Sequence, residues 1–163
     1  MVVGGKESAP EVMGMVGVVL FAHSGLAGAF KHAASQIVGD MPAVEVVDID
    51  PKSSFDEIEH ALDEAIHRAD RGDGVVVLTD LFGGSPANFS LARMKPGKVE
   101  VVCGLNLAML LKVFDLRQHG LTDVAAMAKA VARSGRENVV VASEVLAPAD
   151  AIRGSGKIFG AGS

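Results

Sequence analysis

Two titratable side chains stand at equivalent places in the chain, each at the end of a run of apolar residues. His23 follows the run 16–21, and Asp80 follows the run 75–78. A carboxylate that accepts the hydrogen of one imidazole nitrogen fixes the ring tautomer and leaves the lone pair of the other nitrogen free to attack. It also stabilises the positive ring that forms when that nitrogen takes up a phosphoryl group. If the fold brings the two together, His23 is predicted to be a nucleophile oriented by Asp80.

The segment 80–88 has the composition of an anion-binding loop. It reads Asp-Leu-Phe-Gly-Gly-Ser-Pro-Ala-Asn. Gly83 and Gly84 let the backbone approach a ligand closely. Ser85 followed by Pro86 predicts a serine-capped helix start with unpaired N–H groups, and the Ser85 hydroxyl can add a further hydrogen bond. We therefore predict a phosphate-binding loop whose chemistry requires neither a metal nor a cofactor.

Short β-rich runs alternate with amphipathic helices along the chain, and these elements must position the two side chains. Continuous apolar runs are typical of buried parallel strands, and apolar residues three or four apart predict helices. The predicted strands are 16–21, 44–47, 75–78, 99–103 and 139–141, and the predicted helices are 26–38, 55–69, 85–94, 107–119 and 122–134.

This alternation predicts an α/β fold, a doubly wound and mainly parallel sheet with right-handed crossovers. In the flavodoxin-like strand order 2-1-3-4, the first and third strands are neighbours. His23 and Asp80 would then lie side by side beyond the carboxyl ends of the strands, where such sheets place their sites.

Local signals predict where several helices begin and end. Ser54 and Glu57 have capping-box spacing, and Thr122 is the expected N-cap of the last helix. Gly39 and Gly135 are expected to end the helices that precede them. The expected buried stripe of the first helix is formed by Leu26, Phe30, Ala33 and Ile37.

The composition excludes several classes of protein. The chain has 163 residues, a formal net charge of −5 and no cluster of basic residues, so nothing indicates nucleic-acid binding. The single cysteine, Cys103, excludes an internal disulfide and is expected to be a small buried residue. Apolar runs are far shorter than the ~20 residues of a membrane span, and no signal peptide is recognisable. We expect a soluble, cytoplasmic protein without direct membrane insertion.

One domain is expected over residues 15–142. It follows a loosely ordered extension over residues 1–14 and precedes an extension over residues 143–163 that is rich in glycine at its end. The Gly-x-Gly-Lys sequence at 154–157 lacks both a preceding strand and a following serine or threonine, so it does not predict a phosphate loop.

Three motifs together resemble a known family. They are Val-Leu-Phe-Ala-His-Ser-Gly at 19–25, Val-Leu-Thr-Asp-Leu-Phe-Gly-Gly-Ser-Pro-Ala-Asn at 77–88 and Gly-Leu-Asn-Leu-Ala-Met at 104–109. In this order and spacing, over roughly residues 15–142, the chain is similar to the mannose-family enzyme IIA domain of the bacterial phosphoenolpyruvate:sugar phosphotransferase system.

The resemblance implies a function and a set of partners. It implies that the phosphocarrier HPr phosphorylates His23, which then donates to an enzyme IIB domain for sugar uptake. It implies that Asp80 orients His23 and that Gly84 and Ser85 line the phosphate pocket. Ser24 and Gly83 are also predicted to bind the phosphate. It also implies a homodimer that exchanges an antiparallel C-terminal edge strand, here around 139–141. Asn106 is expected to border the site or the dimer contact.

Ser24 departs from the family pattern, in which glycine commonly follows the phosphorylated histidine. A His-Ser pair is similar to the phosphotransfer subunit of dihydroxyacetone kinase, whereas the loop after Asp80 is typical of the mannose group. A free-standing regulatory phosphocarrier is a further alternative. So is a non-enzymatic, flavodoxin-like module that binds a small anion, although the chain has no Trp or Tyr to stack on a flavin.

The remaining histidines do not predict a metal site. His60, Glu64 and His67 share one face of a predicted helix, but that face is the polar side of an amphipathic pattern, which is typical of a solvated surface. His32 and His119 are also expected at the surface.

Overall fold

The computed structural model describes residues 14–146, and these form a four-stranded parallel sheet. The strands are β1 (Gly17–His23), β2 (Val44–Ile49), β3 (Val75–Thr79) and β4 (Val99–Cys103). Their order in the sheet is β2-β1-β3-β4, and every pairing is parallel. The predicted doubly wound fold with strand order 2-1-3-4 is therefore confirmed. Most of the extensions expected at 1–14 and 143–163 lies outside the described residues.

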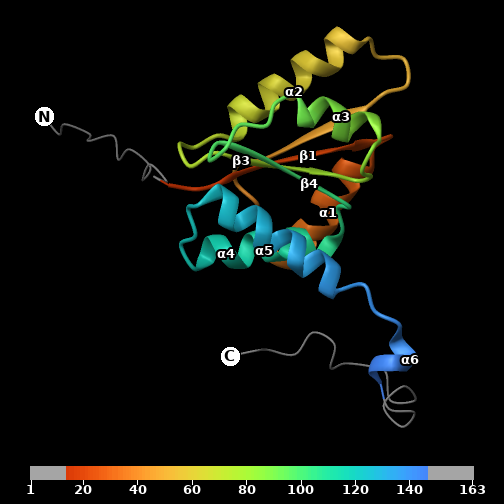
Figure 1. The fold of residues 1–163 in the computed structure, drawn as a ribbon, viewed down its shortest axis with the longest axis vertical. Coiled ribbons are helices and arrows are strands. Elements are labelled where there is room, and N and C mark those ends of the chain that lie inside the picture. The colour runs from red at the N-terminus through yellow and green to blue at the C-terminus, as the bar shows by residue number, and fades with distance from the viewer. Residues whose placement is uncertain (1–13, 147–163) are drawn as a thin grey trace, which may run out of the picture.

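Helices cover both faces of the sheet (Figure 1). One face carries α1 (Leu26–Val38), α4 (Leu107–Gln118) and α5 (Val124–Glu137), and the other carries α2 (Phe55–Ala69) and α3 (Ser85–Leu91). The short helix α6 (Ala142–Val145) lies away from the sheet, after the end of α5. Within residues 14–146, no helix has both the length and the apolar character needed to cross a membrane.

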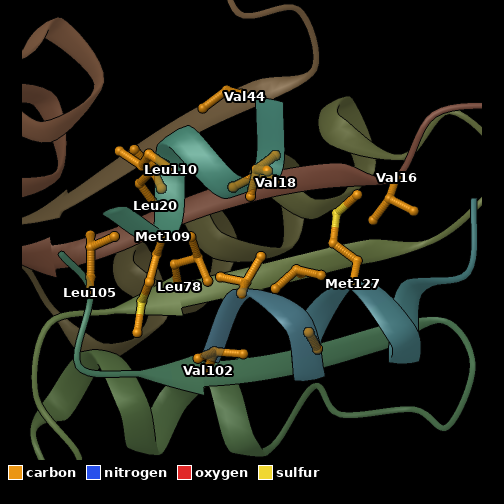
Figure 2. Packing of buried hydrophobic residues seen from close by; sticks show 14 of the residues in the cluster. Val16, Val18, Leu20, Val44, Leu78, Val102, Leu105, Met109, Leu110 and Met127 are labelled. Carbon is orange, nitrogen blue, oxygen red and sulfur yellow. The ribbon is translucent and has the colours of Figure 1, made fainter. Parts of the chain in front are cut away.

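The core consists of two apolar clusters separated by the sheet. Side chains along β1 alternate between them, because successive residues of a strand point to opposite faces. Val18 and Leu20 belong to the cluster under α1, α4 and α5, which Figure 2 shows, whereas Val19 and Phe21 belong to the cluster under α2 and α3. The same alternation assigns His23, the last residue of β1, to the α2–α3 face.

The buried stripe of α1 differs from the expected one. Ala27 and Ala34 are fully buried, whereas Leu26 and Ile37 are 41% and 52% exposed. The two alanines let the helix lie close to the sheet, so the small residues face inward although larger apolar residues were expected there.

Both expected boundaries of α5 are wrong. The N-cap of α5 is Asp123 and not Thr122, because the Asp123 carboxylate accepts a hydrogen bond from the Ala126 N–H at 2.8 Å. Gly135 does not end α5, which continues to Glu137. A side chain at Gly135 would collide with Met109 of α4, so this glycine serves the close packing of two helices. The capping box of Ser54 and Glu57 and the end of α1 at Gly39 are confirmed.

The predicted strand at 139–141 is wrong for the single chain. Val139, Val140 and Val141 pair with no strand in the described part of the chain and are 79%, 60% and 56% exposed. They follow α5 in the segment that leads away from the sheet to α6 (Figure 1), where no neighbouring strand offers backbone partners. Exchange of this segment with a second copy stays a prediction.

Gly17 of β1 is expected to tolerate no side chain, because it packs against the end of α2. A Cβ built there would lie 2.6 Å from the carbonyl carbon of Ala69, the last residue of α2, so Gly17→Ala must push α2 off the sheet. We expect a loss of about 1–3 kcal/mol in the free energy of unfolding, measured by urea denaturation.

The matched control is Gly28→Ala in α1, where the nearest atom to a built Cβ is Asp48 Oδ2 at 3.4 Å. Since Ala favours a helix interior over Gly by about 0.5–1 kcal/mol, this variant should unfold no more easily than the parent. Equal stability of Gly17→Ala and the parent would contradict the packing argument.

Candidate functional site

His23 and Asp80 are in direct contact at the carboxyl edge of the sheet. Asp80 Oδ2 accepts hydrogen bonds from the backbone N–H of His23 at 3.1 Å and from its ring Nδ1 at 2.8 Å. An ionised carboxylate can only accept, so Nδ1 carries the hydrogen and Nε2 keeps its lone pair. The His23 side chain is 44% exposed and that of Asp80 13% exposed. The ring is thus held from its inner side, while its outer side is open to solvent.

Strand order brings these two residues together. β1 and β3 are parallel neighbours, and Phe21 pairs with Thr79 in their register. The residues that come next on each strand therefore reach the same edge, although 57 positions separate them in sequence. Asp80 lies just beyond the last residue of β3, and from there its carboxylate accepts the hydrogen bond of the His23 backbone N–H.

The charge of Asp80 reflects two opposing effects. Burial disfavours the charged carboxylate and by itself raises the pKa of Asp80, but the hydrogen bonds from the ring and backbone of His23, together with the positive charge of the protonated ring, outweigh it. The net result is a pKa below the ordinary value. Asp80 is therefore a carboxylate at neutral pH, as an acceptor for Nδ1–H must be.

The loop after Asp80 packs against the imidazole through a glycine. A Cβ built on Gly84 would lie 3.1 Å from His23 Cε1 and 3.7 Å from Nε2, so any larger residue would press on the ring. Gly83 has φ +83°, a conformation that favours glycine. The side chain of Asn88 donates to the carbonyl of Gly83 at 3.4 Å and holds the loop in place.

The start of α3 differs from the expected one. Its N-cap is Gly84, whose carbonyl accepts the first helical hydrogen bond from Asn88 at 3.0 Å. Ser85 is therefore the first helical residue and not a cap, and Pro86 occupies the second position. Because the helix begins one residue earlier than predicted, the exposed Ser85 hydroxyl is not used to cap α3.

The turn after His23 contains two consecutive left-handed residues, Ser24 at φ +47° and Gly25 at φ +76°. The left-handed conformation of Ser24 is unfavourable for a residue with a Cβ, which gives a physical reason why glycine suits position 24. The backbone N–H of Ser24 donates to the carbonyl of Ile49 at 3.3 Å, which ties the turn to β2.

Asp48 is a structural residue of this edge that the sequence analysis missed. Its two carboxylate oxygens accept from the N–H groups of Ala27 at 2.9 Å and Gly28 at 3.2 Å, so a residue of β2 caps α1. The helix's own N-cap, Gly25, has no side chain for this purpose. The available signal was an acidic residue directly after the predicted strand 44–47, at the same edge of the sheet as His23.

Asn106 joins two helices. Its side-chain oxygen caps α4 by accepting from the N–H of Met109 at 3.1 Å, and its amide nitrogen donates to the carbonyl of Gly135 in α5 at 3.1 Å. Both ends of this side chain are therefore engaged in packing α4 against α5. Its expected place at the border of the site or of a dimer stays a prediction.

The other candidate side chains lie apart from this site. His60 and Glu64 form an exposed pair at 3.3 Å, and His32 and His119 are exposed. Within residues 14–146, no three His, Cys, Asp or Glu side chains are grouped as metal ligands. Cys103 is only partly buried, which differs from the expectation, because it ends the edge strand β4. The sequence at 154–157 lies outside the described residues.

Comparison with known proteins gives a consistent result. The family described as PTS system fructose IIA component (EIIA-man) matches residues 17–132. The sorbose-specific EIIA component of Lacticaseibacillus casei is 33% identical over 97 residues, which are 59% of this chain and 70% of that protein. The fructose-specific EIIA component of Bacillus subtilis is 25% identical over 121 residues, 73% and 83% of the two chains.

Solved structures share the fold. The crystal structure of phosphotransferase system component EIIA from Streptococcus agalactiae superposes with a TM-score of 0.71 at 26% identity, covering 80% of this chain and 99% of that one. The PTS IIA protein associated with the fucose utilization operon from Streptococcus pneumoniae shares the fold with a TM-score of 0.71 at 23% identity, covering 83% of this chain and 98% of that one.

The lowered pKa of Asp80 predicts that the difference in free energy of unfolding between the parent and Asp80→Asn depends on pH. A lowered pKa means that the folded state is stabilised while Asp80 is ionised in both states, above about pH 4, and that this stabilisation is lost as the pH falls through the folded-state value. We expect the parent to exceed Asp80→Asn by about 1–3 kcal/mol in free energy of unfolding at pH 5 and the gap to narrow toward pH 3.

Urea denaturation at half-unit steps of pH measures this gap. A difference that stays constant from pH 5 to pH 3 would show that the carboxylate charge of Asp80 does not stabilise the fold.

Proposed function

This chain belongs to the family of PTS fructose IIA components, and from that premise we propose that it is a phosphohistidine carrier. His23 accepts a phosphoryl group from phospho-HPr and passes it to an enzyme IIB domain for sugar uptake. The observation that carries the proposal is the 2.8 Å contact between His23 Nδ1 and Asp80 Oδ2, which leaves Nε2 as the nucleophile on a partly exposed ring.

The transfer needs one bond to form and one to break. The Nε2 lone pair of His23 forms a new N–P bond while the N–P bond of the donor breaks, and the electron pair of that bond returns to the donor's imidazole. The His23 ring gains positive charge and keeps its hydrogen on Nδ1. The Asp80 carboxylate stabilises that charge through a hydrogen bond that already exists before the reaction, so little reorganisation is needed.

The phosphoryl group would be held by the turn after His23 and the loop after Asp80. Gly84 lies against the ring carbon next to Nε2, so the backbone around Gly83 and Gly84 is close to the attacking atom. Ser85 and Ser24 are exposed, and they directly follow Gly84 and His23 in the chain. We assign phosphate binding to these four residues.

The wider context follows from the same proposal. The carrier would act in the cytoplasm as a homodimer that exchanges the segment around 139–141. The three exposed valines there support this, since a run of apolar side chains away from the sheet is stabilised when a second chain covers it.

Phosphorylation of His23 is tested by incubating the protein with phosphoenolpyruvate, enzyme I and HPr. We expect the mass of one phosphoryl group on the parent, an acid-labile bond as in a phosphoramidate, and no label on His23→Ala. The matched control is His119→Ala, which removes an exposed histidine at the end of α4 and should be labelled like the parent. Label that persists on His23→Ala would refute the assignment of the site.

Asp80→Asn should slow the transfer by about 10- to 1000-fold, because a neutral amide oxygen accepts the Nδ1 hydrogen more weakly than a carboxylate and carries no charge to stabilise the phosphorylated ring. Quenched-flow labelling by phospho-HPr measures the rate. Asp48→Asn is the control, since Asp48 is a carboxylate of the same sheet edge whose hydrogen bonds go to α1. An unchanged rate for Asp80→Asn would remove Asp80 from the mechanism.

A further inference from the structure

A cavity lies at the edge of the sheet opposite to His23. Its volume is about 300 Å³, and it is lined by Met15, Asp40, Pro42, Phe114, Arg117 and Gln118. Met15 and Pro42 each stand two residues before a strand, β1 and β2 respectively. Because these strands are parallel, their starts share one edge of the sheet, about 20 Å from the end of β1. We refer to this feature as the amino-edge cavity.

Arg117, in the last turn of α4, is a partly buried cation of this cavity. Its Nε and Nη2 donate to the carbonyl of Val16 at 3.1 and 2.6 Å, and Nη2 also donates to that of Ala43 at 3.2 Å. Its Nη1 donates to the carbonyl of Pro42 at 2.7 Å. A guanidinium has five N–H groups, so one N–H of Nη1 has no partner among residues 14–146. Backbone carbonyls thus fix the side chain and leave one donor for a ligand.

The charge of Arg117 has no counterion in the part of the chain that the structure describes. No carboxylate there forms an ion pair with it. Burial lowers the pKa of Arg117 to about 10, because the charged form is poorly solvated, but the side chain remains a cation at neutral pH. A buried charge is costly unless it is paired, so an anion that reaches this guanidinium is bound favourably.

Asp40 supplies the opposite charge. It lies in the turn between α1 and β2, is exposed, and forms no ion pair within the described range 14–146. Asp40 and Arg117 therefore line the same cavity and lie too far apart to neutralise each other. A simple anion would meet the repulsion of Asp40, and a simple amine that of Arg117. A ligand that carries both charges satisfies both groups.

The remaining lining is apolar apart from the amide of Gln118. Met15, Pro42 and Phe114 offer a thioether, a pyrrolidine ring and an aromatic ring. Small-molecule sites commonly combine such an apolar wall with a few polar groups that fix the ligand's orientation, in volumes from about 300 Å³ upward. The cavity thus suits a small ligand with an apolar body and two opposite charges.

We propose that the amino-edge cavity binds a free α-amino acid with an apolar side chain. The carboxylate of the amino acid pairs with Arg117 and its ammonium group with Asp40, while its side chain lies against the apolar wall. The cavity shares no residue with the phosphoryl site, so binding of an amino acid is tested separately from the carrier function.

Isothermal titration of the full chain with L-leucine tests the site. We expect one bound leucine with a Kd of about 0.05–1 mM and a Tm that rises as leucine is added. Two analogues test the charges of the ligand. 4-Methylpentanoate lacks the ammonium group and leucinamide lacks the carboxylate, so each should bind about 10-fold more weakly or less.

Asp40→Asn tests the protein side, because it removes one charge at an exposed position. It should weaken binding of L-leucine by about 3- to 10-fold and should not weaken binding of 4-methylpentanoate. The matched control is Asp56→Asn, which removes an exposed carboxylate at the start of α2, on the other face of the sheet, and should bind leucine like the parent. Arg117 is kept, since it also holds the starts of β1 and β2.

Three outcomes would overturn the proposal. The first is no heat of binding and no change in Tm with L-leucine at about 10 mM, well above the expected Kd. The second is equal affinity for leucine, leucinamide and 4-methylpentanoate, because the cavity would then select an apolar chain alone. The third is an unchanged affinity for leucine in Asp40→Asn, with thermal unfolding showing that the variant is folded.

Discussion

A single carboxylate oxygen organises the site. Asp80 Oδ2 binds both the backbone N–H and the ring Nδ1 of His23, so one atom fixes the end of β1, the orientation of the imidazole and its tautomer. The arrangement depends on β1 and β3 being neighbours, since only then do residues 57 positions apart share an edge. Because the pKa of Asp80 is lowered by these contacts, the acceptor remains charged at neutral pH.

Polar side chains at the other strand ends have structural tasks. Asp48, near the end of β2, caps α1 with both carboxylate oxygens, and Asn106, just after β4, caps α4 and bonds to α5. Each satisfies backbone groups that a helix end would otherwise leave unpaired. Within the described residues, Nε2 of His23 by contrast forms no hydrogen bond and belongs to a side chain that is 44% exposed, as the proposed phosphoryl acceptor requires.

Two backbone features shape the surroundings of the His23 imidazole. Gly84 gives the loop close access to the imidazole, and Ser24 accepts an unfavourable left-handed conformation in the turn that starts α1. These backbone features keep space free around Nε2.

The sequence by itself determined the alternation of strands and helices, the positions of His23 and Asp80 at strand ends and the capping box at Ser54, because these follow from local periodicity and short-range hydrogen bonds. The order 2-1-3-4, which brings the two side chains together, was predicted from the flavodoxin-like pattern and is confirmed by the structure. Only the tertiary structure decided which face of α1 is buried, that Asp48 caps this helix from 21 residues away in β2, and that Gly135 lies inside α5. Those outcomes depend on how closely two elements pack and on which polar group then reaches a free N–H. The spacing of residues along one element encodes neither the packing distance between elements nor the partner of that N–H.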